Sequence, residues 1–196
     1  RIKLLKQLKI FLMSKVIKSL NGIKLMRLKL HSDARGKFYE IYNKKRFFKI
    51  GIKDKFVQDS ISESKKNVLR GMHYTIKDPQ SQLLTVVEGE IFDCLVDLRK
   101  NSKFFGNFFS FKLNSKKNNQ IYMPPGIAHG FCVLSKKVIL HYNSSKVYDP
   151  MNEGGLLGND KNININWPIN KPIISKKDKN FDTLNKIIVL NKLPKL

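Results

Sequence analysis

The feature that most constrains the fold is a succession of short apolar runs, rich in β-branched residues and separated by turn-forming clusters. Turn clusters lie at residues 99–102, 114–119 and 124–126. Many short strands at close spacing, with no long helical period among them, are typical of an all-β sandwich or barrel. The sequence therefore predicts an all-β fold with short helical or extended segments at its ends. The predicted strands cover residues 56–59, 68–74, 83–87, 91–98, 108–113, 120–123, 130–134 and 138–143.

Two short signals predict local turns. The dipeptide Asn21-Gly22 interrupts a loosely alternating segment and predicts a turn there. Glu88-Gly89-Glu90 separates two strongly β-branched runs and predicts a tight hairpin between them. The tail is rich in Asn, Lys and Pro, and we expect only short helical turns near residues 178–188. We see no internal repeat and no second domain, so residues 13–196 are expected to form a single domain.

The first twelve residues are basic and apolar. Residues 4–12 are a candidate helix. A basic, apolar segment of this kind also resembles the front of a signal peptide or an amphipathic membrane helix. No small-residue cleavage site follows, and Met13 begins a segment that fits a natural start leading into a strand. We therefore expect residues 1–12 to be an upstream extension without a function of its own.

The formal net charge of +23 raises the question of nucleic-acid binding. The chain has 32 Lys but only 6 Arg, and the lysines are scattered along its whole length. Sites for bases and phosphates favour Arg, whose planar guanidinium donates two parallel hydrogen bonds. We therefore expect a solvated basic surface that attracts anionic ligands, and no nucleic-acid partner. No run of 18 or more apolar residues is present, so no membrane partner is expected either.

The cysteines and histidines do not follow metal-site patterns. Cys94 and Cys132 lie in separate apolar stretches and form no CxxC pair or Cys/His cluster. This excludes a disulfide framework and favours a reducing, cytoplasmic setting. Metal-binding barrels often use an HxH pair, whereas His73 is followed by Tyr74 and Thr75. We therefore expect no metal, and a metal-dependent oxygenase is disfavoured.

Polar groups capable of chemistry lie within the predicted strands. In a regular strand, Arg70 and Met72 share one face, and Gly71 and His73 share the other. A single histidine in a strand is more often structural than functional, so His73 by itself indicates little.

Other strands contribute a second set of such groups. His129 follows a Pro-Pro-Gly turn, and Tyr142 lies in a further apolar run. If these strands line one barrel, His73, Arg70, His129 and Tyr142 converge at its mouth. Ligand sites of small barrels usually lie there.

A series of motifs occurs in order over most of the chain, from about Met13 to Asp178. It comprises DARGKFYE at 33–40, FVQD at 56–59, VLRGMHY at 68–74, VVEGEIFDCLVDLR at 86–99, PPGIAHGFCVLS at 124–135, the segment 142–148, ND at 159–160, NWP at 166–168 and ISKKD at 174–178. In this combination the chain resembles the dTDP-4-dehydrorhamnose 3,5-epimerase family. The resemblance implies a cupin-type jelly-roll β-barrel.

The resemblance also implies an activity, without a metal or another cofactor. Family members epimerise C3 and C5 of a nucleotide-linked 4-keto-6-deoxyhexose, here dTDP-4-dehydro-6-deoxy-D-glucose, by removing and returning a proton. It makes His73 the base, Asp178 the partner of its other ring nitrogen, and Tyr142 the acid. From the residues alone, Asp178 could instead only cap a short helix, because Ser175 precedes it at capping-box spacing.

The resemblance further implies a set of substrate-binding residues and a strand-exchanged homodimer. Some nucleotide contacts then come from the partner subunit. The positions that match the family's binding positions are Arg70, His129, Gln82, Gln58, Ser60, Arg35, Phe38, Glu40 and Tyr148.

One departure leaves alternatives open. The family usually has Gly-Lys-Leu where this chain has Ser81-Gln82-Leu83, and that lysine polarises the 4-keto oxygen. Glutamine can donate a hydrogen bond but carries no charge, and charge-assisted hydrogen bonds are stronger. A single-centre epimerase on another 4-keto sugar nucleotide and a non-catalytic sugar-nucleotide-binding protein therefore stay open. A ketoisomerase of a related barrel group is disfavoured by the RGMHY motif.

Overall fold

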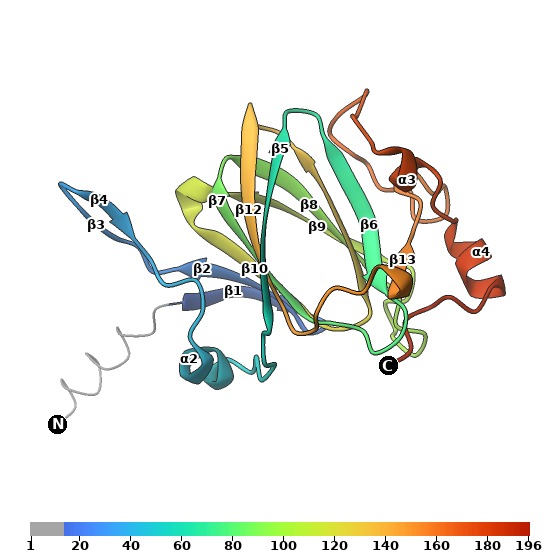
Figure 1. Cartoon of the computed structure of the whole chain (residues 1–196), viewed down its shortest axis with the longest axis horizontal. Helices are drawn as coiled ribbons and strands as arrows, with labels where there is room; N and C mark the ends of the chain where they lie inside the picture. The colour runs from blue at the N-terminus through green and yellow to red at the C-terminus, as the bar shows by residue number, and fades with distance from the viewer. Residues whose placement is uncertain (1–13) are drawn as a thin grey trace.

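The computed structural model describes residues 14–196, so the expected extension and the candidate helix at residues 4–12 lie outside the described residues. Two antiparallel sheets face each other and form a barrel (Figure 1). The first sheet has the order β1 (Ser14–Leu20), β2 (Ile23–Leu28), β10 (Asn119–Met123), β7 (Gln82–Glu88), β12 (Lys137–Ser144) and β5 (Gln58–Lys65). The second has the order β13 (Glu153–Gly155), β6 (Leu69–Thr75), β11 (Ile127–Val133), β8 (Glu90–Asp97) and β9 (Phe108–Asn114). The predicted all-β jelly-roll barrel is confirmed.

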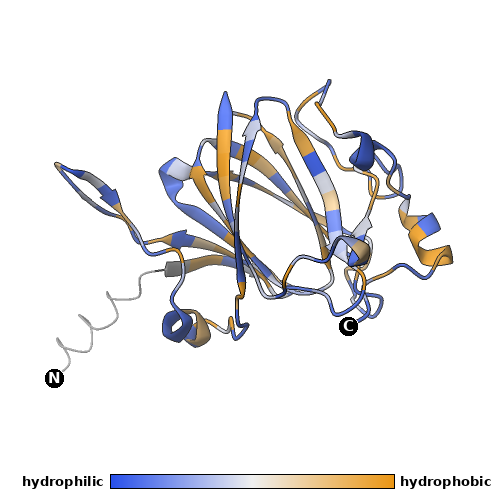
Figure 2. Cartoon of the chain, in the orientation of Figure 1, coloured by the Kyte–Doolittle hydropathy of each residue, from blue (hydrophilic) through white to orange (hydrophobic). Residues whose placement is uncertain are grey.

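The main core fills the space between the two sheets. On β8, Ile91 and Leu95 belong to this inner core, whereas Cys94 and Val96 belong to a second core outside the sheet. All four side chains are fully buried. A strand that is buried on both faces has no need of polar alternation, which explains the continuous apolar run in the sequence. Figure 2 shows apolar residues along the strands of both sheets.

Short helices cover the outer faces of the sheets. Phe47 of α2 (Lys44–Lys49) packs against the six-stranded sheet. Leu184 and Ile187 of α4 (Leu184–Val189) pack against the five-stranded sheet, and α3 (Lys176–Lys179) precedes α4 in the same tail. The predicted helical turns of the tail are therefore present, whereas α2 was not predicted. None of the helices within residues 14–196 is long and apolar enough to cross a membrane.

A two-stranded hairpin, β3 (His31–Asp33) and β4 (Gly36–Phe38), extends away from the barrel (Figure 1). The Phe38 side chain at its end is 70% exposed. The residues that the structure describes therefore leave this apolar side chain largely in contact with water.

The predicted hairpin at Glu88-Gly89-Glu90 was wrong. Strands β7 and β8 do flank Gly89, but they belong to different sheets. Gly89 lies at the corner where the chain passes between the sheets, with φ of +85°. A Cβ atom at this position would lie 2.2 Å from the carbonyl oxygen of Lys137. The need for a glycine at this position therefore comes from the close approach of another backbone segment. It does not come from a hairpin turn.

The remaining turns agree better with the predictions. Asn21 and Gly22 both have positive φ and join β1 to β2, as expected for a two-residue hairpin. Two short 3₁₀ helices, η1 (Ser115–Lys117) and η2 (Pro150–Asn152), occupy polar connections. Strand β5 extends to Lys65 through a Ser-rich segment, beyond the strand that was predicted at residues 56–59. Because β5 is an edge strand, its polar side chains can remain in water.

Candidate active site

A cavity of about 520 Å³ opens between the two sheets. Strands β6 and β11 of one sheet and β7 and β12 of the other supply its functional side chains. Arg70, His73, His129 and Tyr142 all line it, so the structure brings together the four groups that were expected to converge. The expected residues Gln82 and Tyr148 line it as well.

A β-bulge places Arg70 and His73 on the same side of β6. His73 pairs with His129, and Arg70 pairs with Phe131, so three steps along β6 match two steps along β11. The extra residue reverses the alternation of side chains, and Met72 faces the outer core. The prediction that Arg70 shares a face with Met72, opposite His73, was therefore wrong. Regular alternation cannot reveal a bulge.

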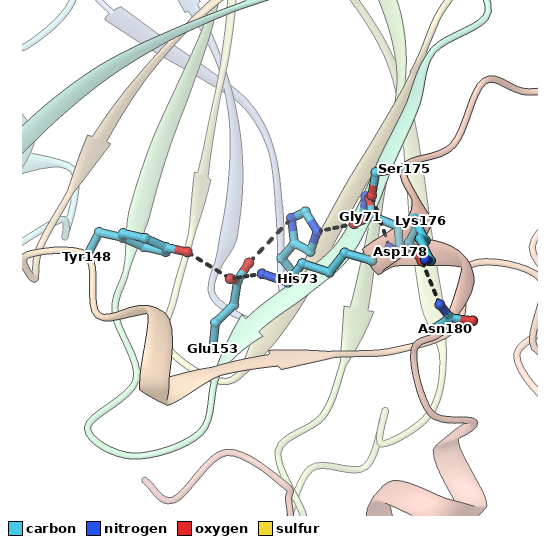
Figure 3. A network of polar contacts seen from close by, with 9 residues as sticks. Gly71, His73, Tyr148, Glu153, Ser175, Lys176, Asp178 and Asn180 are labelled. Carbon is cyan, nitrogen blue, oxygen red and sulfur yellow. Dashed lines mark hydrogen bonds and ion pairs between the residues drawn. The ribbon is translucent and has the colours of Figure 1, made fainter.

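His73 is held by a buried carboxylate from the C-terminal tail. Its Nε2 lies 3.1 Å from Oδ1 of Asp178, and the other carboxylate oxygen accepts the Gly71 backbone N–H at 2.9 Å (Figure 3). The Asp178 N–H donates to the Ser175 hydroxyl at 3.0 Å. Ser175 therefore caps α3, as the capping alternative expected, while the Asp178 side chain contacts His73.

The hydrogen bonds to Asp178 decide its charge. Burial raises the pKa of the carboxyl, but the hydrogen bonds from His73 and from the Gly71 N–H outweigh burial and lower the pKa to about 2. Asp178 is therefore an acceptor at neutral pH, and Nε2 of His73 must carry the proton between them. The other ring nitrogen, Nδ1, is then the one that can take up a proton.

Tyr142 faces the same cavity from β12 in the opposite sheet. Burial and the negative charge of Asp93 raise the pKa of its phenol, against smaller opposing effects of Ser62 and Arg70. The phenol is therefore kept protonated and can donate a proton. The cavity thus has a base on one sheet and an acid on the other.

Comparison with known proteins agrees with this geometry. Residues 18–186 match the family described as dTDP-4-dehydrorhamnose 3,5-epimerase. The chain belongs to this epimerase family.

Individual relatives of the epimerase family cover most of the chain. A dTDP-4-dehydrorhamnose 3,5-epimerase of Shigella flexneri is 44% identical to this chain. The alignment covers 78% of this chain and 85% of the Shigella protein. A dTDP-4-dehydrorhamnose 3-epimerase of Streptomyces niveus is 36% identical. That alignment covers 75% of this chain and 72% of the Streptomyces protein. The crystal structure of a Legionella pneumophila 3,5-epimerase with dTDP-4-keto-L-rhamnose has a TM-score of 0.88 at 36% identity, and covers 93% of this chain and 98% of that chain.

Five residues at epimerase binding positions do not line the cavity of their own chain. Gln58 and Ser60 lie on the edge strand β5 and hydrogen-bond each other at 3.2 Å. Arg35 and Phe38 lie on the projecting hairpin, where Arg35 pairs with Asp33 and has a side chain 90% exposed. Glu40 follows that hairpin and pairs with Arg46 at 2.7 Å. One chain therefore does not gather these five residues in its own cavity, and their role in binding stays a prediction.

Three polar groups of the site escaped the sequence analysis. Glu153 lies 3.9 Å from Nδ1 of His73 and accepts hydrogen bonds from the Tyr148 hydroxyl and from Lys177 (Figure 3). Asp93 hydrogen-bonds His129 inside the barrel. Glu153 and Lys177 lie in polar segments without a period, so no pattern distinguishes them. Asp93 had a signal, since it is the one charged residue between Ile91 and Leu95.

The residues that the structure describes contain no cluster of three or more His, Cys, Asp or Glu side chains that could hold a metal ion. The histidines that line the cavity, His73 and His129, instead each contact a carboxylate of their own, at 3.1 and 2.7 Å.

The lowered pKa of Asp178 predicts a dependence of stability on acid pH. A carboxyl whose pKa is lower in the folded state contributes stability above its ordinary pKa of 3.8 and loses it as the pH falls towards about 2. The shift corresponds to roughly 2 kcal/mol. We expect the free energy of unfolding in urea, followed by Trp167 fluorescence, to fall more between pH 5 and pH 2.5 in the native protein than in Asp178→Asn. Equal falls would contradict the assignment.

Proposed function

We propose that the protein epimerises dTDP-4-dehydro-6-deoxy-D-glucose at C3 and C5 to give dTDP-4-dehydro-L-rhamnose. The observation that carries this proposal is the His73–Asp178 pair on one sheet facing Tyr142 on the other across one cavity. Inverting a carbon needs a proton removed from one face and another delivered to the opposite face. A base and an acid on opposite walls of a cavity provide this arrangement.

In the proposed reaction, Nδ1 of His73 removes the proton from C5 or C3. The electron pair of the broken C–H bond forms the C=C bond of an enolate, and the negative charge moves to the 4-oxygen. The buried Asp178 carboxylate holds the ring and stabilises the imidazolium that forms. The phenol of Tyr142 then protonates the same carbon from the opposite face. Exchange with water returns His73 and Tyr142 to their starting states.

The remaining cavity residues are proposed to bind the substrate. The Arg70 guanidinium is oriented by the Ser64 hydroxyl at 2.9 Å and suits an anionic oxygen. Gln82 donates to the Ser144 hydroxyl at 3.1 Å and lines the cavity. Tyr148, 54% exposed at the rim, offers an aromatic face to the nucleotide.

The nucleotide contacts that one chain lacks are proposed to come from a second copy. The projecting hairpin with Arg35 and Phe38 is exposed, and we expect it to reach the cavity of the partner in a homodimer. The free edge of β5, which carries Gln58 and Ser60, is available for the same contact. Because Cys94 and Cys132 are unpaired, a reducing cytoplasm is the proposed location.

Mixed dimers test this contact. An Arg35→Ala/Phe38→Ala variant and a His73→Ala variant should each be nearly inactive at low substrate concentration. In a co-expressed mixture, half of the dimers are hybrids, and each hybrid has one intact site if the hairpin acts on its partner. We expect about one quarter of native activity.

Co-expression of His73→Ala with Asp178→Asn is the matched control, because both changes affect the same pair and no hybrid site is intact. Activity no higher than that of the separate variants in the first mixture would contradict the exchanged hairpin. Native activity in the hairpin variant alone would do the same.

A specific observation favours one alternative, inversion of a single centre. Gln82 carries no charge, and removing one oxyanion donor commonly costs about 10²–10³ in rate. An enzyme with a less stabilised enolate would complete the easier of two inversions first. The 3-epimerase relative shows that single-centre enzymes occur within the similarity range of this chain.

Solvent exchange distinguishes these activities. The protein is incubated in D₂O with dTDP-4-dehydro-6-deoxy-D-glucose, and deuterium at each sugar carbon is followed by NMR. Deuterium at both C3 and C5 is the expected result, and deuterium at one carbon would establish the single-centre alternative. dTDP-glucose is the control, because without the ketone its C–H bonds are not acidic. If neither C3 nor C5 takes up deuterium, the proposed function is overturned.

A further inference from the structure

We propose that the protein has a second binding site, apart from the substrate cavity, for a small organic molecule that carries a phosphate group. The site is the basic cleft, a hollow of about 690 Å³ between the loop that follows β8, residues 99–103, and the C-terminal segment, residues 188–196. The two cavities share no lining residue. The inference therefore goes beyond the proposed epimerisation and does not depend on it.

The basic cleft gathers positive charge without an acidic side chain. The cations that line it are one arginine and three lysines: Arg99, Lys100, Lys103 and Lys195. None of the described residues that line it is Asp or Glu. The three lysines are exposed, and within residues 14–196 none of them pairs with a carboxylate. Like charges that are held near one another repel, and an anion bound between them relieves this repulsion.

Arg99 is a fixed donor at the wall of the basic cleft. Its Nε and Nη2 donate to the two carboxylate oxygens of Asp97 at 2.9 and 2.7 Å, and Nη2 also donates to the Asn21 carbonyl at 3.0 Å. Asp97 is fully buried, so the guanidinium is held in one position. Nη1 makes none of these hydrogen bonds and is left for a ligand. Because the donor is already ordered, little side-chain entropy is lost on binding.

The C-terminal segment adds an apolar wall to the basic cleft. The apolar residues that line it are Ile188, Leu193, Pro194 and Leu196. Leu193 packs against the outer core, and the backbone N–H of Lys195 donates to the Ile76 carbonyl at 2.6 Å. The wall is therefore held against the barrel. An apolar wall next to a group of cations suits a ligand with both an apolar and an anionic part.

Phosphate is the anionic group that these donors fit best. Because Asp97 offsets the charge of Arg99, the net charge of the basic cleft comes from its three lysines. A phosphate monoester carries a charge of about −2 and has three strong acceptor oxygens. Lysine ammonium groups bind such a group as point charges, and a guanidinium N–H adds a directed hydrogen bond. A single carboxylate would leave most of this charge uncompensated.

The basic cleft and the substrate cavity are neighbours. Pro124 and Gly126 line the substrate cavity. A Cβ atom at Gly126 would lie 2.4 Å from Cγ of Arg99, so this turn lies between the two cavities. The substrate cavity contains Arg70, which also suits an anion. Binding in the two places must therefore be separated by variants.

Pyrophosphate binding, measured by equilibrium dialysis with radiolabelled pyrophosphate, tests the basic cleft. In Lys100→Ala/Lys103→Ala we expect one bound equivalent per chain to be lost, or its affinity to fall at least tenfold, because two of the three unpaired charges are gone. Both lysines are exposed, so the variant is expected to fold. Binding equal to that of the native protein would overturn the proposal.

Lys116→Ala/Lys117→Ala is the matched control. These lysines are exposed on η1, outside the basic cleft, and their removal changes the net charge by the same amount. The control should bind pyrophosphate like the native protein. An equal loss in both lysine variants would show a general attraction to the basic surface and would overturn the site.

Arg70→Ala separates the basic cleft from the substrate cavity. It should leave unchanged the binding that depends on Lys100 and Lys103. If Arg70→Ala removes the same equivalent, the anion lies in the substrate cavity and the second site is overturned. These results do not require turnover, whereas absence of deuterium exchange in the unaltered protein would count against the proposed function and not against this site.

The apolar part of the ligand is tested with two phosphate monoesters of equal charge. Phenyl phosphate and methyl phosphate are titrated into Arg70→Ala and followed by phosphorus NMR. We expect phenyl phosphate to bind about tenfold more tightly, because its ring buries apolar surface against Leu193 and Pro194. Equal affinities would overturn the assignment of an organic ligand to the basic cleft.

Discussion

Alanine at position 73 is expected to lower kcat by about 10²–10⁴, the range that a general base contributes. His73 is the cavity residue with a ring nitrogen free to take a proton and with its other nitrogen held by a buried carboxylate. Deuterium exchange at C3 and C5 should fall with the same factor, because the variant cannot form the enolate. Binding of the product nucleotide sugar, measured by calorimetry, should change little.

His141→Asn is a suitable control, because His141 lies on β12 beside Tyr142 but does not line the cavity. It should retain exchange at both carbons. Exchange that survives in His73→Ala would contradict the assigned base. The base would then be sought at Glu153, whose carboxylate lies 3.9 Å from the His73 ring.

The second large effect is expected for Tyr142→Phe, and it should separate two steps. The variant lacks the phenol proton, so inversion should slow by about 10²–10⁴. Removal of the proton by His73 does not need Tyr142, so the enolate can still form and take deuterium back on its original face. We therefore expect exchange without inversion, seen by NMR as deuterated starting sugar.

Tyr74→Phe is the matched control. Tyr74 directly follows His73 on β6, but its hydroxyl donates to the Lys192 carbonyl at 3.0 Å on the outer side. It should keep inversion and exchange coupled. If Tyr142→Phe loses exchange and inversion to the same extent, the acid must be assigned to another residue.

Much of the barrel could be predicted because its causes are local. Runs such as residues 91–98 are apolar because both faces of the strand are buried. The turn at Asn21-Gly22 depends only on the positive φ angles that these two residues readily adopt. By contrast, the partner of a strand depends on distant contacts. Gly89 marks a corner between sheets, but a glycine flanked by two strands is equally expected in a hairpin.

The site was predictable in its residue types and less so in its arrangement. His73, His129 and Tyr142 were found from strands and motifs, and the structure gathers them in one cavity. The contact with Asp178, 105 positions away, followed from resemblance and not from any local pattern. Arg35 and Phe38 were expected at the nucleotide, yet one chain leaves both on an exposed hairpin.

The sequence by itself determined the all-β class, most of the strand positions, the Asn21-Gly22 turn and the family, because burial, turn chemistry and motif order are properties of neighbouring residues. Tertiary structure alone decided which sheet each strand joins, the β6 bulge that places Arg70 beside His73, and the two His–Asp pairs. These depend on backbones and charges that meet across the barrel. The energy of such contacts depends on the distance between the groups and on their burial. Neither quantity can be read from the separation of the residues along the chain.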